Sequence, residues 1–149
     1  MGFLRALPLA LICVLAFAPH ALQASDATSD PALERARKLL KRTILIDGHN
    51  DLPWQVRINR EFPQDVKRYD LRGHVSGQTD LARLEAGGVG AQFWSVYVPG
   101  NPPGNWARTQ LEQFDIAKRI IARYPEALRY VDSAAGIRRA KRSGKIGSL

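Results

Sequence analysis

Short β-forming runs alternate with amphipathic helical patterns along residues 31–149, and this alternation most restricts how the chain can fold. Runs rich in β-branched, aliphatic and aromatic residues at 43–46 and 91–98, and a third that begins at Lys145, predict strands. Helices are predicted before and between them, over residues 31–42, 80–86, 106–124 and 134–142. This order of elements is typical of right-handed parallel α/β units. The sequence therefore predicts an α/β fold with a parallel sheet.

Four segments carry more specific expectations. The run Thr43 to Ile46 has no polar alternation, which favours a strand covered on both faces. Residues 53–78 show no periodicity and are predicted to form a long loop, a kind of loop that is often functional. Thr79 is predicted to cap the helix that follows. The buried face of the 106–124 helix is predicted from its apolar spacing to carry Leu111, Phe114, Ala117, Ile121 and Tyr124.

The last β-forming run begins at Lys145 and is only five residues long in this sequence, which ends at Leu149. About three parallel strands are too few to close a barrel. A last strand that is cut short leaves an edge of the sheet with unpaired backbone N–H and C=O groups, which is unfavourable. We therefore expect the sequence to be the truncated N-terminal part of a larger α/β protein.

Residues 1–24 have the pattern of a secretory signal peptide. Arg5 precedes an apolar run at 6–18, and small residues then lead to a plausible cleavage point near Ala24. The run is short for a membrane span of about 20 residues, which leaves an uncleaved anchor as the alternative. Cys13, the only cysteine, would leave with the signal. We expect a secreted or periplasmic protein without disulfides, whose single domain portion is 25–149.

The chain is basic, with a formal net charge of +8, and several of its cations cluster near the C-terminal end. A nucleic-acid surface would combine such a cluster with aromatic side chains that stack on bases. Tyr130 is the aromatic residue near this cluster, and the cations of 134–142 fit one solvated helix face. The sequence therefore does not predict nucleic-acid binding.

Asp47-Gly48-His49-Asn50-Asp51 follows the first predicted strand directly. His49 and Asp51 are two residues apart, so in extended backbone their side chains point to the same side. An imidazole and a carboxylate together suit zinc or another borderline divalent ion better than calcium. A hydrogen-bonded loop pair without metal is the alternative. Asp47 either orients the imidazole or only finishes the strand.

Two sequence blocks resemble the membrane (renal) dipeptidase family of zinc peptidases. The first is ILIDGHNDLPW at residues 44–54, and the second joins TDLARL at 79–84 to GGVGAQFWSVY at 87–97. The sequence at 111–113 is also similar to the family. The resemblance covers most of residues 43–98.

The resemblance implies a (β/α)8 TIM-type barrel with two zinc ions at its mouth. It also implies hydrolysis of dipeptides by a hydroxide held between the two metals. His49 and Asp51 match ligands of one zinc. The family's bridging glutamate, the histidines of the second site and the residues for substrate and proton transfer have no counterpart in this sequence. No catalytic residue is therefore assigned within the chain, and we expect it to be inactive alone.

Two other functions compete with this interpretation. One is a different metal-dependent amidohydrolase of the barrel class, although such enzymes more typically begin with two histidines where this chain has His49 and Asp51. The other is a secreted, non-enzymatic basic module that binds anionic polymers. For the dipeptidase, the expected partner is a dipeptide substrate, and membrane association would occur only through the N-terminal segment. The sequence predicts neither the dipeptide specificity nor the oligomeric state.

Overall fold

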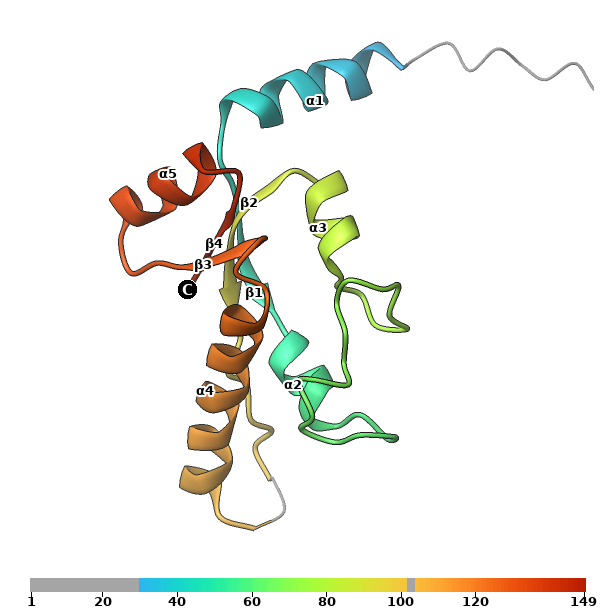
Figure 1. Cartoon of the computed structure of the whole chain (residues 1–149), viewed down its shortest axis with the longest axis vertical. Coiled ribbons are helices and arrows are strands. Elements are labelled where there is room, and N and C mark those ends of the chain that lie inside the picture. Colours follow the sequence, from blue (N-terminus) through green and yellow to red (C-terminus); the bar gives the residue numbers. More distant parts are fainter. Residues whose placement is uncertain (1–29, 102–103) are drawn as a thin grey trace, which may run out of the picture.

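The computed structural model describes residues 30–101 and 104–149, so the predicted signal peptide at 1–24 lies outside the described residues. The described elements follow in an α/β order, which confirms the α/β part of the prediction (Figure 1). Their bounds are α1 Pro31–Arg42, β1 Leu45–Asn50, α2 Leu52–Arg57, α3 Leu81–Ala86, β2 Val89–Trp94, α4 Trp106–Arg123, β3 Leu128–Tyr130, α5 Ala134–Arg142 and β4 Ile146–Ser148.

The strands form one four-stranded sheet in the order β1-β2-β4-β3, and every pairing is parallel. Because all four strands run in the same direction, their carboxyl-terminal ends lie together at one end of the sheet. β1 runs toward this end and continues into α2, and α4 extends beyond it before returning the chain to β3 (Figure 1).

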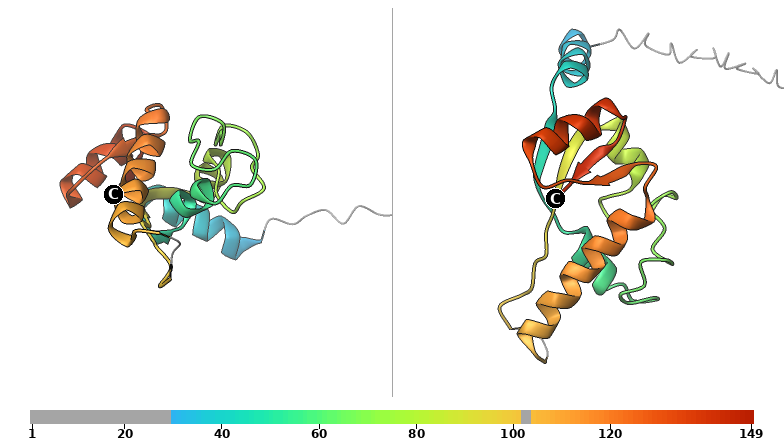
Figure 2. Two further views of the ribbon diagram at one scale, coloured as in Figure 1. Left: turned by 90° about the horizontal axis from the view of Figure 1, so that it is seen from below. Right: turned by 60° about the vertical axis from the view of Figure 1, so that its left-hand side comes forward.

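Helices cover both faces of the sheet. On one face, α5 packs its Ile137 and Ala140 near Ala91 of β2. The larger core on the other face joins Leu84 of α3, Trp94 of β2 and the inner side of α4. Figure 2 shows α5 crossing the strands on the side opposite α3. Within the described residues, no helix has the length and apolarity needed to cross a membrane.

Two expectations about the strands are wrong. The count of about three strands misses β3, which has only three residues, of which Leu128 alone is buried, so the sequence shows no alternation there. β1, the outermost strand of the described sheet, is also not covered on both faces, because the side chains of its first two residues remain exposed. Leu45 and Ile46 are accordingly 39% and 47% exposed.

The predicted buried face of α4 is correct for Ala117 and Tyr124, which are buried, and for Ile121, which packs partly buried against the core, but it is wrong for Leu111 and Phe114. The helix buries Thr109, Gln113, Ile116, Ala117 and Ile120, whereas Leu111 is 69% exposed and Phe114 is also exposed. The physical reason is a polar contact with α2: Arg57 Nε donates to Gln113 Oε1 at 2.7 Å, and Arg57 Nη2 donates to the Thr109 carbonyl at 3.1 Å. This contact turns polar residues of α4 inward.

Candidate metal centre

His49 and Asp51 lie together at the carboxyl end of β1. His49 is the penultimate residue of the strand, and Asp51 occupies the N-cap of α2 without using its side chain as a cap. The His49 Nε2 and Asp51 Oδ1 atoms are 3.1 Å apart, and both side chains are accessible to solvent. The predicted convergence of the two side chains is therefore confirmed as geometry.

His49 itself lies within a β-bulge of β1, between Asp47 and Asn50. Asp47 pairs with Gln92 and Asn50 pairs with Trp94, so β1 has one more residue than β2 between these positions. Bulges of this kind are common beside active sites, where they change the direction of a side chain. Asp47 Oδ1 accepts a hydrogen bond from the His49 backbone N–H at 3.1 Å. Of the two roles predicted for Asp47, this contact favours finishing the strand over orienting the imidazole.

The separation of the two polar atoms suits a shared metal ion. With zinc–nitrogen and zinc–oxygen bonds near 2.1 Å, two ligands of one tetrahedral zinc lie about 3.4 Å apart. The observed 3.1 Å differs from this by a few tenths of an ångström, although it equally suits the hydrogen bond that the two side chains share. Over residues 30–101 and 104–149, no group of three or more His, Cys, Asp or Glu side chains could hold a metal. The pair therefore fits two ligands of a metal site and does not complete one.

The pair opens into a pocket of about 480 Å³. Besides His49 to Leu52, its lining includes Gln55, Tyr69, Ser76, Gly77, Gln78 and Thr79. The loop predicted over 53–78 thus begins with helix α2, and its later part forms one wall. Burial raises the pKa of the Tyr69 phenol above its ordinary value of 10.0, although the nearby Arg83 guanidinium partly opposes this. The phenol is therefore protonated at neutral pH and can donate a hydrogen bond.

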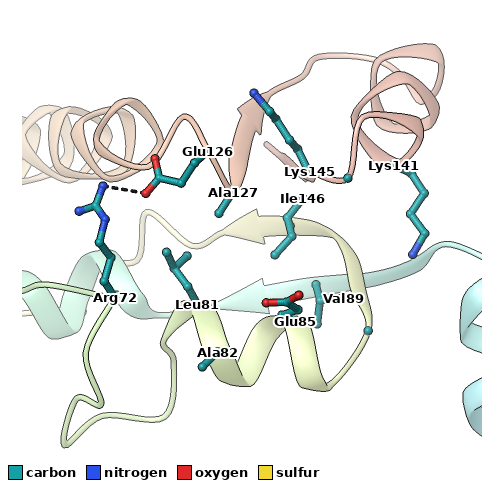
Figure 3. A pocket seen from close by; sticks show the side chains of 12 residues that line it. Arg72, Leu81, Ala82, Glu85, Val89, Glu126, Ala127, Lys141, Lys145 and Ile146 are labelled. Carbon is teal, nitrogen blue, oxygen red and sulfur yellow. Dashed lines mark hydrogen bonds and ion pairs between the residues drawn. The ribbon is translucent and has the colours of Figure 1, made fainter.

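A larger pocket, about 680 Å³, lies at the opposite end of the sheet (Figure 3). It borders Val89 and Ile146, which are the first residues of β2 and β4, and the Arg72–Glu126 ion pair closes one side at 2.7 Å. In parallel α/β folds, ligands bind at the carboxyl ends of the strands. The smaller pocket beside His49 is therefore the candidate site.

A hydrogen-bond network near the pair was not identified from the sequence. The Asn50 side chain bonds the side chains of Thr79 and Gln92, which lie 29 and 42 residues further along the chain. Thr79 does not cap α3 as predicted, because Asp80 is the N-cap and accepts from the Arg83 backbone N–H at 2.8 Å. No local pattern in the sequence indicates the contacts of Thr79 with Asn50. His74 is exposed.

Asp80 gives this region a predictable pH dependence. The Arg83 backbone N–H holds the pKa of the Asp80 carboxyl below its ordinary value of 3.8, burial opposes this, and the Arg83 side chain adds to the lowering. A lowered folded-state pKa contributes stability that is present above about pH 4 and is lost as the pH falls through the folded-state value. Asp80→Asn keeps an oxygen for the cap but removes the charge. We expect the melting temperature of this variant to fall less steeply than that of the unmodified protein as the pH is lowered from about 6 to about 2. An equally steep fall in both proteins would contradict this role of Asp80.

Comparison with known proteins identifies the family and the fold. A model of the family described as Membrane dipeptidase (Peptidase family M19) matches residues 33–149. Dipeptidase ataJ from Aspergillus terreus is 38% identical over 135 residues, which are 84% of this chain and 32% of that protein. The chain thus spans about a third of the length of this curated relative.

Two solved structures share the fold at low sequence identity. One is a metallo peptidase from Rhodobacter sphaeroides liganded with a phosphinate mimic of the dipeptide L-Ala-D-Ala, with a TM-score of 0.55 and 21% identity, covering 71% of this chain and 36% of that one. The other is the probable dipeptidase PvdM from Pseudomonas aeruginosa, with a TM-score of 0.57 and 16% identity, covering 80% and 31%. Since the family model extends from α1 to the last described strand, the chain belongs to the membrane dipeptidase family.

Proposed function

We propose that the whole protein is a zinc-dependent dipeptidase and that this chain supplies His49 and Asp51 as ligands of one of two zinc ions. The observation that carries the proposal is the 3.1 Å separation of His49 Nε2 and Asp51 Oδ1 at the carboxyl end of β1. We further propose that β1, β2 and β4, which lie side by side in this order, belong to a (β/α)8 barrel, in which active sites lie at this end of the strands. The position of β3 beyond β4 and the helices on both faces depart from such a barrel, whose strands follow chain order inside one ring of helices.

The names of the relatives support the reaction class. The curated relative is called a dipeptidase, and one structural neighbour is a metallo peptidase with a bound dipeptide mimic. Membership of the membrane dipeptidase family favours this reaction over the other barrel amidohydrolases and over a non-enzymatic basic module. The proposed substrate is accordingly a dipeptide.

The residues of this chain would contribute ligands and one wall of the substrate pocket. His49 and Asp51 would hold the metal from two positions fixed by the end of β1 and the start of α2. Bound zinc supplies Lewis acidity and generates a nucleophile from water near neutral pH. Tyr69 and Gln55 border the same pocket, where a protonated phenol can donate to a polar group of a substrate.

We propose that the chain alone does not turn over dipeptides. A catalytic zinc ordinarily has three protein ligands and an open position. The described residues bring together two ligands at this pocket and no group of three. We also propose that residues 1–24 are a cleaved signal peptide, which would make the protein secreted or periplasmic.

Metal removal tests the proposed function. We expect the purified whole protein to contain about two zinc ions and to hydrolyse dipeptides, because two metals activate water and stabilise the developing charge. Dialysis against a chelator should abolish hydrolysis, and added zinc should restore it. Metal content is measured by atomic emission, and hydrolysis by the release of free amino acids. A whole protein without zinc whose hydrolysis is unaffected by chelators would contradict the proposal.

A further inference from the structure

Asn50 lies between the two proposed zinc ligands, and its side-chain amide contacts three other segments of the chain. Its Nδ2 group donates to Thr79 Oγ1 at 3.0 Å and to Gln92 Oε1 at 3.4 Å. Its Oδ1 atom accepts from the Leu52 backbone N–H at 3.0 Å and from Thr79 Oγ1 at 3.2 Å. The amide therefore ties the end of β1 to β2, to the start of α2 and to the residue before the α3 cap.

The partners of Asn50 are themselves fixed. Gln92 is fully buried, and its Nε2 group donates to the Phe93 carbonyl at 3.1 Å and to the Asp47 carbonyl at 3.4 Å. Thr79 is buried and precedes Asp80, which caps α3. The backbone at Leu81 is held in turn, because its N–H donates to the Leu71 carbonyl at 3.0 Å. Asn50 itself is partly buried, and a polar network whose hydrogen bonds are made between buried partners holds one geometry.

The hydrogen bonds of the Asn50 side chain lie where the pairing of β1 with β2 is irregular. The bulge between Asp47 and Asn50 leaves the backbone around His49 less constrained by the sheet. Asn50 fixes the backbone next to both ligands by two hydrogen bonds. Its carbonyl accepts from the Ser95 N–H at 2.9 Å, and its side-chain Oδ1 accepts from the N–H of Leu52, the residue after Asp51. The directions of His49 and Asp51 therefore depend on the placement of Asn50.

We infer that Asn50 and Thr79 are positioning residues, which hold His49 and Asp51 in the relative orientation that binds zinc. This inference rests on the proposed function, because it assigns a role relative to the same metal. Neither residue needs to contact the metal. Groups that hydrogen-bond a ligand directly change metal affinity by about 10–100-fold when they are removed, and Asn50 and Thr79 act one step further out, through the backbone on either side of Asp51.

Removing one hydroxyl tests this role with little change in shape. Thr79→Val in the whole protein should weaken zinc binding by up to about 10-fold, at or below the low end of the loss for a group bonded directly to a ligand, because Thr79 acts through Asn50. Thr79→Ser, which retains the hydroxyl, should restore most of the affinity. Thr109→Val is the matched control, because Thr109 has the same 8% exposure and also donates a hydrogen bond to a carbonyl, that of Asn105 at 3.0 Å. Its zinc affinity should equal that of the unmodified protein. Affinity is measured by competition with a chromophoric zinc chelator, under conditions where circular dichroism shows the fold intact.

The outcomes separate this inference from the proposed function. If Thr79→Val binds zinc as tightly as the unmodified protein while His49→Ala does not, the positioning role is wrong and the metal assignment stands. If His49→Ala also retains zinc, the metal assignment itself is wrong. Equal losses of affinity in Thr79→Val and Thr109→Val would also overturn the positioning role. Should Thr79→Val fail to fold, Asn50→Ala gives the second test, and unchanged zinc affinity in that variant would overturn the inference.

Discussion

His49→Ala in the whole protein is expected to lower zinc affinity and dipeptide hydrolysis by more than about 100-fold. Removing a group that hydrogen-bonds a metal ligand lowers metal affinity by about 10–100-fold, so removing the ligand itself should lower it by more. The imidazole Nε2 atom lies 3.1 Å from the Asp51 carboxylate, and alanine has no atom that could replace it. Metal content per chain and kcat/KM for a dipeptide measure the two effects.

His74→Ala is the matched control for this substitution. His74 is also a histidine near a carboxylate, with its Nδ1 atom 3.5 Å from Asp80 Oδ2, but its side chain is 82% exposed and does not line the candidate pocket. We expect this variant to retain zinc and hydrolysis. If the two histidine variants lost activity equally, or if His49→Ala retained its metal, His49 would not be a ligand. Asp51→Asn should fall between them, because the amide keeps the shape and loses the charge.

The parts of the fold that depend on local patterns could be predicted from the sequence. The strand–helix alternation and the convergence of His49 with Asp51 both arise within short segments. Two side chains two residues apart need only an extended backbone to meet. The site pair was therefore predictable, and the family motif reinforced it.

The parts that depend on contacts between distant segments could not be predicted in this way. Gln113 is buried because Arg57 and the Tyr97 carbonyl bind its two amide atoms, and both partners lie outside α4. Apolar periodicity assigns such a residue to the surface and Leu111 to the core, which is the reverse of what is observed. The Asn50–Thr79–Gln92 network escapes sequence analysis for the same reason.

Tyr124 is the residue of the core for which we expect the largest loss of stability. It is fully buried at the end of α4, and its hydroxyl accepts from the Leu71 backbone N–H at 2.8 Å and donates to the Tyr69 carbonyl at 3.2 Å. Arg72 also lies over its ring, 4.7 Å from the centroid. The side chain therefore joins α4 to the loop that forms one wall of the candidate pocket.

Two substitutions at this position separate the hydroxyl from the ring. Tyr124→Phe leaves the buried Leu71 N–H without its partner, which should cost about 1–3 kcal/mol in the free energy of unfolding. Tyr124→Ala also leaves a cavity in the core, and loss of a buried aromatic ring typically costs about 3–5 kcal/mol, a large part of a total stability of about 5–15 kcal/mol. Tyr130→Phe is the control: Tyr130 is 66% exposed, so its effect should stay within about 0.5 kcal/mol. Urea unfolding followed by circular dichroism measures all three. Since Tyr124 holds the loop through Leu71 and Tyr69, a Tyr124→Phe variant as stable as Tyr130→Phe would mean that the loop is held by its apolar contacts alone.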